Sequence, residues 1–283
     1  MEDIWSHNWG AIEDVQPLFY EMGMGYTQVA ICVSEPNQNI YVTFRGTDVM
    51  EFPDVLANLD ILMDDFGPPP KQQQQHHHHQ QQQQQCPDGI SIPGKVQRGW
   101  NRKVFNPDLY LPLSEKLLQT KDKYSDYQVI IAGHSLGAAL SILYGVYVAK
   151  YVLPDEQVEV MNLGSPRVGN EEFYHGIQSI ENLKIWRMVY RNDVVPRCPP
   201  MWMGYRHVGH LLHWDDDDEC FKAYHQQLES CMDSQCYKGI DIRDWNILTG
   251  NIGHHKHDNY KRVVERAKGD PQKYWPKGFE NIL

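Results

Sequence analysis

The chain has 283 residues, of which 41% are hydrophobic and 22% are charged. This globular composition excludes a collagen, a coiled coil and a wholly disordered tail. Asp and Glu outnumber Lys and Arg by 37 to 26, giving a formal net charge of −11. Because a protein that binds nucleic-acid phosphates needs a basic surface, no nucleic-acid partner is expected.

The printed N-terminus, residues 1–7, lacks the basic start and apolar run of a secretory signal. Residues 138–153 form the longest apolar-leaning stretch and fall short of the roughly 20 residues of a membrane span, so no transmembrane segment is expected. A cytoplasmic location is the default expectation, and a secreted one applies if the true start lies upstream. The six cysteines show no C-x-x-C spacing and leave the redox compartment open.

The first half of the chain predicts two strands and then an irregular region. Residues 40–44 alternate apolar and polar side chains, as strands do, and residues 28–33 are expected to pair with them across a turn at 35–37. Residues 48–66 mix acids with apolar residues, partly at helical spacing. They predict a short amphipathic helix or helices.

A tract of glutamine and histidine interrupts the chain. Residues 72–85 contain only these two residue types, so they have no apolar face to bury. We expect a disordered insertion at about 68–90. His76–His79 could bind a metal, but the repeat around them favours a neutral expansion.

The pattern becomes regular after the tract. Residues 128–132 are a continuous apolar run, as in a strand buried on both faces, and 136–152 have helical composition. Further strands are predicted at 158–163 and 184–190. Alternating strands and helices predict an α/β fold with a central, mostly parallel sheet flanked by helices. Since no linker divides 100–197, we expect one domain over 1–283.

The strongest functional signal is Gly133-His134-Ser135-Leu136-Gly137, placed between the buried strand and the helix. A serine in a sharp strand-to-helix turn takes a strained conformation that lifts its hydroxyl clear of the sheet. The helix N-terminus then offers N–H groups where an oxyanion would form. Ser135 is the predicted nucleophile.

Five segments in order resemble the class 3 lipase family of α/β-hydrolases, which includes fungal triacylglycerol lipases. They are Val42–Thr47, Lys95–Trp100, Ile131–Ala139, Asn162–Asn170 and Arg191–Arg197. The resemblance implies a serine ester hydrolase acting on lipid esters, with acylglycerol as the favoured substrate, and no metal or organic cofactor. A phospholipase A1-type enzyme or general carboxylesterase is the alternative, and a catalytically inactive lipase-like binding protein is the second.

A nucleophilic serine needs a histidine base and a carboxylate that orients it. In α/β-hydrolases these follow the serine in the order acid, then histidine. Asp193 lies just past the strand at 184–190 and matches the family's acid. The base is open between His255, which has Tyr260 five residues on, and His257, which has Tyr260 three residues on; His254 is a weaker candidate. A helix is predicted at 258–268.

The oxyanion requires two donors. The first is the N–H of Leu136, which follows the nucleophile. By resemblance the second is Thr47, whereas Arg45 is a scaffold residue. The resemblance also implies a lid at 48–61 that opens at an oil–water or membrane interface; the alternative is that its apolar face packs on the core. Gln97 departs from the family, which usually has histidine there.

Three other clusters rank lower. His207, His210 and His213 recur every third residue, but they match a family segment better than a zinc site. Residues 215–219 are acidic without the spaced ligands of a calcium loop. Ser165 lacks the context of a second nucleophile. No metal site is expected.

Overall fold

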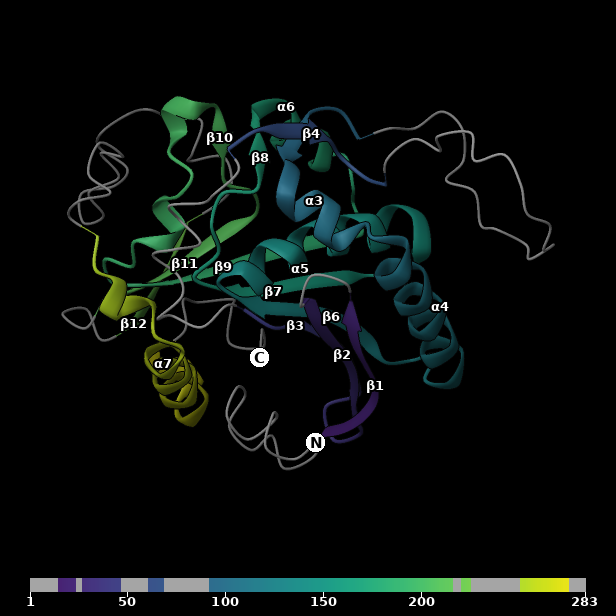
Figure 1. The fold of residues 1–283 in the computed structure, drawn as a ribbon. Helices are drawn as coiled ribbons and strands as arrows, with labels where there is room; N and C mark the ends of the chain where they lie inside the picture. The colour runs from purple at the N-terminus through teal and green to yellow at the C-terminus, as the bar shows by residue number, and fades with distance from the viewer. Residues whose placement is uncertain are drawn as a thin grey trace.

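The computed structural model describes residues 15–23, 27–46, 61–68, 92–215, 220–224 and 250–274. Figure 1 shows the arrangement of their helices and strands. The predicted Gln/His insertion and most of the predicted lid lie outside the described residues. Among the helices that are described, none combines the length and the apolarity needed to cross a bilayer.

The main sheet has eight strands in the order β1-β2-β3-β6-β7-β9-β11-β12. Its five central strands are parallel: β3 (Asn39–Phe44), β6 (Gln128–His134), β7 (Val158–Leu163), β9 (Leu183–Tyr190) and β11 (His210–Asp215). Antiparallel strands extend both edges: β1 (Val15–Gly23) and β2 (Thr27–Ser34) on one side, β12 (Cys220–Tyr224) on the other. The predicted mostly parallel sheet is confirmed.

A smaller sheet has the order β10-β8-β5-β4. Its strands are only two or three residues long: β4 (Met63–Asp65), β5 (Lys95–Gln97), β8 (Gly169–Asn170) and β10 (Tyr205–Arg206). It joins loops that lie far apart in the sequence.

The helices connect and cover the strands. In chain order they are α3 (Arg98–Val104), α4 (Pro107–Lys123), α5 (Leu136–Tyr147), α6 (Glu171–Ile177), α7 (His257–Gly269) and α8 (Pro271–Tyr274). A π-helical turn η1 (Val148–Val152) continues α5 directly. Short 3₁₀ turns are η2 (Val195–Arg197), η3 (Met201–Met203) and η6 (Ile252–His255).

Each face of the main sheet packs against its own helices. Figure 1 shows α3, α4 and α5 on one side and α7 on the other. Along β6, Val129 and Ile131 belong to the core that contains α4 and α5, whereas Ile130 belongs to the core that contains α7. Since successive strand residues point to opposite faces, a strand covered on both faces must be apolar throughout.

Most predicted elements agree with the structure, but the described end of the range 48–66, predicted as a short amphipathic helix or helices, contains the strand β4 (Met63–Asp65). The antiparallel pair at 28–33 and 40–44 is β2 with β3, and the strands at 128–132, 158–163 and 184–190 are β6, β7 and β9. The helix at 136–152 is α5 with η1. One boundary matters below: the helix predicted at 258–268 begins at His257, which is therefore helical and not in the preceding loop.

Candidate active site

Ser135 lies in a sharp bend between β6 and α5. Its backbone has φ 59° and ψ −125°, in a region that side chains other than glycine rarely occupy. Its N–H donates to the Leu163 carbonyl at 3.0 Å, and its carbonyl accepts from Ala138 N–H at 3.0 Å. A Cβ on Gly133 would lie 2.2 Å from the Gly137 carbonyl oxygen, so the bend needs glycine there.

The Ser135 hydroxyl is fully buried and makes no hydrogen bond to any described residue. Ser135 is nevertheless the N-cap residue of α5, where a serine hydroxyl normally accepts a backbone N–H of the first helical turn. The bend turns the hydroxyl away from that role. The Ser135 hydroxyl therefore does not stabilise the helix through a cap hydrogen bond.

Asp193 follows β9 and lies at the same edge of the sheet as Ser135, because the carboxyl ends of parallel strands share an edge. Its carboxylate is buried and accepts three hydrogen bonds. Val195 N–H donates to Oδ1 at 2.9 Å, while His255 Nδ1 and the Tyr260 hydroxyl contact Oδ2 at 2.8 and 2.5 Å. Three donors fix the orientation of the carboxylate.

His255 reaches Asp193 through backbone pairing of two loops. Asn251 N–H donates to the Asn192 carbonyl at 2.8 Å, and residues 193 and 251 form a parallel bridge. η6 follows at once and carries His255, which is fully buried. Of the two histidines that the sequence left open, His255 is the one whose ring nitrogen lies 2.8 Å from the Asp193 carboxylate.

Leu163 and Gly164 bring the pair and the serine to one place. Leu163 accepts the Ser135 N–H. A Cβ built on Gly164, the next residue, would lie 2.9 Å from both Asp193 Oδ2 and His255 Nδ1. Two adjacent residues at the end of β7 therefore contact the bend on one side and the Asp193–His255 pair on the other.

The protonation pattern follows from these partners. Burial and the neighbouring Asp193 carboxylate raise the pKa of Tyr260 well above its ordinary value, so its hydroxyl is a permanent donor. Because a carboxylate can only accept, His255 Nδ1 carries the hydrogen in the 2.8 Å contact. The lone pair of a neutral imidazole then resides on Nε2, the nitrogen that can take a proton.

The predicted oxyanion donors are only partly described. Leu136 is the first residue of α5, and its N–H is one of the four that a helix leaves without an intrahelical acceptor. Thr47 lies outside the described residues. A Cβ on the preceding Gly46 would come within 3.3 Å of Ser135 Cβ, so the described chain that leads to Thr47 runs against the serine.

Three other residues singled out from the sequence have local partners. Arg45 Nη1 donates to Gln28 Oε1 at 2.6 Å, between β2 and the end of β3. Gln97 is buried and caps α3 by accepting the Trp100 N–H, so this departure from the family has a structural role here. Ser165 donates its hydroxyl hydrogen to the Pro166 carbonyl.

The histidines spaced three apart do not converge. His207 Nε2 lies 2.7 Å from the Pro196 carbonyl, and His213 Nε2 lies 3.0 Å from that of Arg191. Within the described part of the chain, no three His, Cys, Asp or Glu side chains are grouped as metal ligands. The acidic stretch at 216–219 and His76–His79 lie outside that part.

Sequence reasoning missed three residues that touch the site. Tyr260 served only as a spacing marker, although its hydroxyl contacts Asp193. His134 was given no role in the sequence analysis, yet its ring stacks on that of His255 with centroids 4.5 Å apart. Gly164 was read as part of a motif. The positive φ of Gly164, 59°, cannot be read from the sequence.

The chain is similar in sequence to fungal lipases. A lipase from Rhizopus niveus is 28% identical over 181 residues, which cover 62% of this chain and 38% of that protein. A secreted mono- and diacylglycerol lipase, MDL5, from Malassezia globosa is 31% identical over 133 residues, 47% of this chain and 42% of that protein. The chain thus matches less than half the length of these curated relatives.

Solved structures share the fold. A lipase from Rhizopus microsporus var. chinensis superimposes with a TM-score of 0.56 at 26% identity, covering 71% of this chain and 62% of that one. Rhizomucor miehei triacylglyceride lipase gives a TM-score of 0.64 at 21% identity, with 86% and 85% coverage. The expected α/β-hydrolase fold is confirmed. The family model for class 3 lipases matches residues 41–203, more than half of the chain, and the chain belongs to that family.

Proposed function

We propose that the protein is a serine ester hydrolase that acts on lipids. The supporting observation is the Ser135 hydroxyl, buried at a strained bend and unused by its helix, beside a hydrogen-bonded Asp193–His255 pair. Ser135 is the nucleophile, His255 the base and Asp193 the acid that orients it. Ser135 Oγ makes no hydrogen bond to a described residue, and in the proposed mechanism it bonds His255 Nε2 once substrate binds, since catalytic hydrogen bonds are often long or poorly aligned without substrate.

The reaction follows from these roles. The Ser135 oxygen attacks the ester carbonyl carbon while His255 Nε2 takes the hydroxyl proton, and Asp193 stabilises the imidazolium through Nδ1–H. The Leu136 N–H and the N–H of Thr47 stabilise the tetrahedral oxyanion. The intermediate collapses to an acyl-serine, and the departing alcohol takes the proton from His255.

Water completes the cycle. His255 removes a proton from a water molecule, whose oxygen attacks the acyl carbon. The second tetrahedral intermediate breaks its bond to Ser135, the serine oxygen takes the proton back, and the fatty acid leaves. Every proton is carried by side chains of this chain, so the scheme requires no metal and no organic cofactor.

An acylglycerol is the favoured substrate. The relatives named above are a lipase and a mono- and diacylglycerol lipase, while a chloroplastic relative from Arabidopsis thaliana, 31% identical over 123 residues, is named phospholipase A1-Igamma2. A net charge of −11 opposes adsorption to an anionic membrane, which favours a neutral lipid at an oil–water interface. Since two relatives are named as secreted, secretion is favoured over the cytoplasmic default.

The test is hydrolysis of p-nitrophenyl butyrate by the wild type and by Ser135→Ala. We expect the variant to lose at least about 10³-fold in kcat, because the covalent step has no nucleophile. Ser141→Ala is the matched control: Ser141 is a buried serine of the same helix, and its hydroxyl bonds the Ala138 carbonyl. Equal rates in wild type and Ser135→Ala contradict the proposal, and absence of hydrolysis in both indicates a binding protein.

A substrate panel then separates the lipid classes. Triacylglycerol, monoacylglycerol and phosphatidylcholine are compared at equal interfacial area. Faster release of fatty acid from either acylglycerol supports the proposal, whereas preference for phosphatidylcholine assigns a phospholipase.

A further inference from the structure

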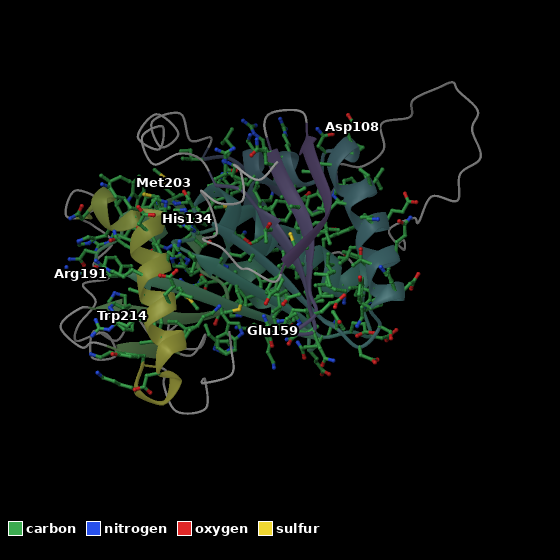
Figure 2. All side chains as sticks on the ribbon, turned by 90° about the horizontal axis from the view of Figure 1, so that it is seen from below. Asp108, His134, Glu159, Arg191, Met203 and Trp214 are labelled. Carbon is green, nitrogen blue, oxygen red and sulfur yellow. The ribbon has the colours of Figure 1, made fainter. Side chains whose placement is uncertain are left out.

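His134, the residue before the proposed nucleophile, makes its main contacts with the proposed base. Its ring stacks on that of His255 with centroids 4.5 Å apart and planes 24° apart. Its Nε2 lies 2.9 Å from the His255 backbone oxygen. Figure 2 shows the labelled His134 side chain beside the yellow helix α7. One side chain thus contacts both the ring and the main chain of His255.

The same ring also contacts α7. Its edge meets Tyr260 at a centroid distance of 5.5 Å and His257 at 5.6 Å. Tyr260 is itself the second side-chain donor to Asp193 Oδ2. His134 therefore packs between the base and the residue that shares the base's carboxylate.

Burial of the His134 ring favours its neutral form. Burial, followed by the neighbouring His255 and His257, lowers the pKa of His134 well below its ordinary value. A neutral imidazole has one N–H, and the His255 carbonyl can only accept, so that hydrogen is on Nε2. The neutral His134 ring therefore donates through Nε2–H to the main chain of His255.

We infer that His134 is a positioning residue, whose stacked ring and Nε2–H hold His255 in register with Asp193 and Ser135. The inference rests on the proposed hydrolase function. Asp193 fixes only the Nδ1 edge of the His255 ring, and rotation about that contact would turn Nε2 away from the serine. The His134 ring, stacked on the face of the His255 ring, opposes this rotation. The hydrogen bond from His134 Nε2 to the His255 carbonyl fixes the position of the His255 backbone.

Three variants separate the two contacts. His134→Gln retains an amide N–H that can reach the His255 carbonyl but loses the stack. His134→Phe retains a stacked ring but loses the donor, and His134→Ala loses both. We expect kcat on p-nitrophenyl butyrate to fall about 10- to 100-fold in the alanine variant with KM within a few-fold of wild type, because misplacement of a catalytic group by about 1 Å has that size of effect. The other two variants should recover part of the loss.

The control is His207→Ala. His207 is also buried, its pKa is also lowered well below the ordinary value, and it also bonds a backbone carbonyl, that of Pro196. Its loss should lower thermal stability while kcat is retained. If His134→Ala keeps wild-type kcat, or if all three His134 variants lose kcat in proportion to their melting temperature, the inference is wrong.

A second measurement does not depend on turnover. In ¹⁵N-histidine-labelled Ser135→Ala protein, the Nδ1–H proton of His255 should give a slowly exchanging signal. Adding His134→Ala should broaden or remove that signal, and His134→Gln should restore it in part. An unchanged signal in the double variant overturns the inference. Inactivity of the wild type would overturn the proposed function alone, since this spectrum still reports on His255.

Discussion

Ser135 breaks a local rule at the residue scale. A serine before the first turn of a helix normally accepts a backbone N–H, which stabilises the helix by about 1 kcal/mol. Here its φ of 59° directs the side chain elsewhere, and the hydroxyl has no described hydrogen-bond partner. Ser135 therefore combines a positive φ with the loss of the usual N-cap hydrogen bond. Both features destabilise the local structure, and such features concentrate at functional sites.

The choice between His255 and His257 gives the first residue-scale prediction. His255→Ala should lower kcat by at least about 10³-fold, because it removes the proposed base. His257→Ala should change kcat by less than about tenfold, because His255 is the histidine that contacts Asp193, while the His257 ring packs in a T-shaped contact on His134. Both are measured with p-nitrophenyl butyrate. The reverse ranking would transfer the role of base to His257.

The second residue-scale prediction concerns Gly164. Gly164→Ala adds a methyl group 2.9 Å from Asp193 Oδ2 and His255 Nδ1 at a φ of 59°. We expect kcat to fall about 100-fold from displacement of the pair, with a loss of about 1–3 kcal/mol in unfolding free energy from strain and overpacking.

Gly204→Ala is the matched control for Gly164→Ala. Gly204 also has positive φ, 86°, but an added Cβ meets nothing within 4 Å. It should lose stability through backbone strain alone and retain kcat. Equal kcat in the two variants would show that Gly164 does not need to be small for the chemistry.

Residues of the site differ in how readily sequence predicts them. The sequence singles out Ser135 and Asp193 as candidates, because a bend between strand and helix, and the end of the next parallel strand but one, are visible as patterns. The structure brings His255, one of the two histidines that the sequence left open, to Asp193. His134 and Tyr260 could not be assigned contacts, because both depend on packing between distant residues. The His134 ring contacts span more than 100 positions, and the carboxylate that Tyr260 shares lies 67 positions away.

At the scale of elements, two loops and one helix assemble the proposed acid and base. The segment before η6 pairs with the loop after β9, and α7 then runs back along the sheet with Tyr260 pointing at Asp193. The Tyr190 N–H at the end of β9 donates to the Tyr260 hydroxyl at 3.2 Å. One hydroxyl therefore connects strand, acid loop and helix.

Tyr260→Phe tests this connection. It removes the 2.5 Å hydrogen bond to Asp193 and leaves the Tyr190 N–H without its acceptor. We expect a loss of about 1–3 kcal/mol in unfolding free energy, the range for a buried group left unsatisfied, and a kcat lowered about tenfold. Urea titration and ester hydrolysis measure the two.

Tyr144→Phe is the control for Tyr260→Phe. Tyr144 is as deeply buried as Tyr260. Its hydroxyl forms a hydrogen bond of 3.1 Å with the hydroxyl of Ser114 on α4. It should lose stability with kcat unchanged. A kcat loss of the same size in both variants would mean that Tyr260 acts only through overall stability.

The sequence pattern, and not the length of an element, decided which elements could be predicted, since the nine-residue β1 was missed. Alternation at 40–44 and a continuous apolar run at 128–132 are patterns typical of strands, whereas β8 and β10 have two residues each and carry no such pattern. α4 was missed although its signals were present: Asn106 caps it, Pro107 opens it, and Leu109, Leu113 and Leu117 recur every four residues on its buried face. The proline inside it, Pro112, weakens a helix prediction.

For the whole molecule, buried histidines make stability depend on pH. Burial lowers the pKa of His134 and of His207 well below 6.5 in the folded state, while the unfolded chain has the ordinary value. Below pH 6.5 the unfolded chain therefore binds more protons, and stability falls as pH falls. Above pH 6.5 both states are neutral at these residues, and neither histidine contributes a slope.

We expect His134 and His207 each to lower the unfolding free energy by up to about 1.4 kcal/mol per pH unit as the pH falls below 6.5. The measurement is the unfolding free energy from urea titrations at pH 7.5, 6.5 and 5.5. His207→Gln, which keeps a donor for the Pro196 carbonyl, should flatten the curve by up to one proton between pH 6.5 and 5.5. Parallel curves for the variant and wild type would contradict the assignment.

The two-sided packing of β6 implies a simple rule of parity. Odd-numbered positions such as Ile131 and Gly133 face the helix that begins after Ser135, and even-numbered ones such as Ile130 and His134 face the side occupied by Tyr260. Whether a random substitution in this strand first disturbs the nucleophile or the base should therefore depend on whether its residue number is odd or even.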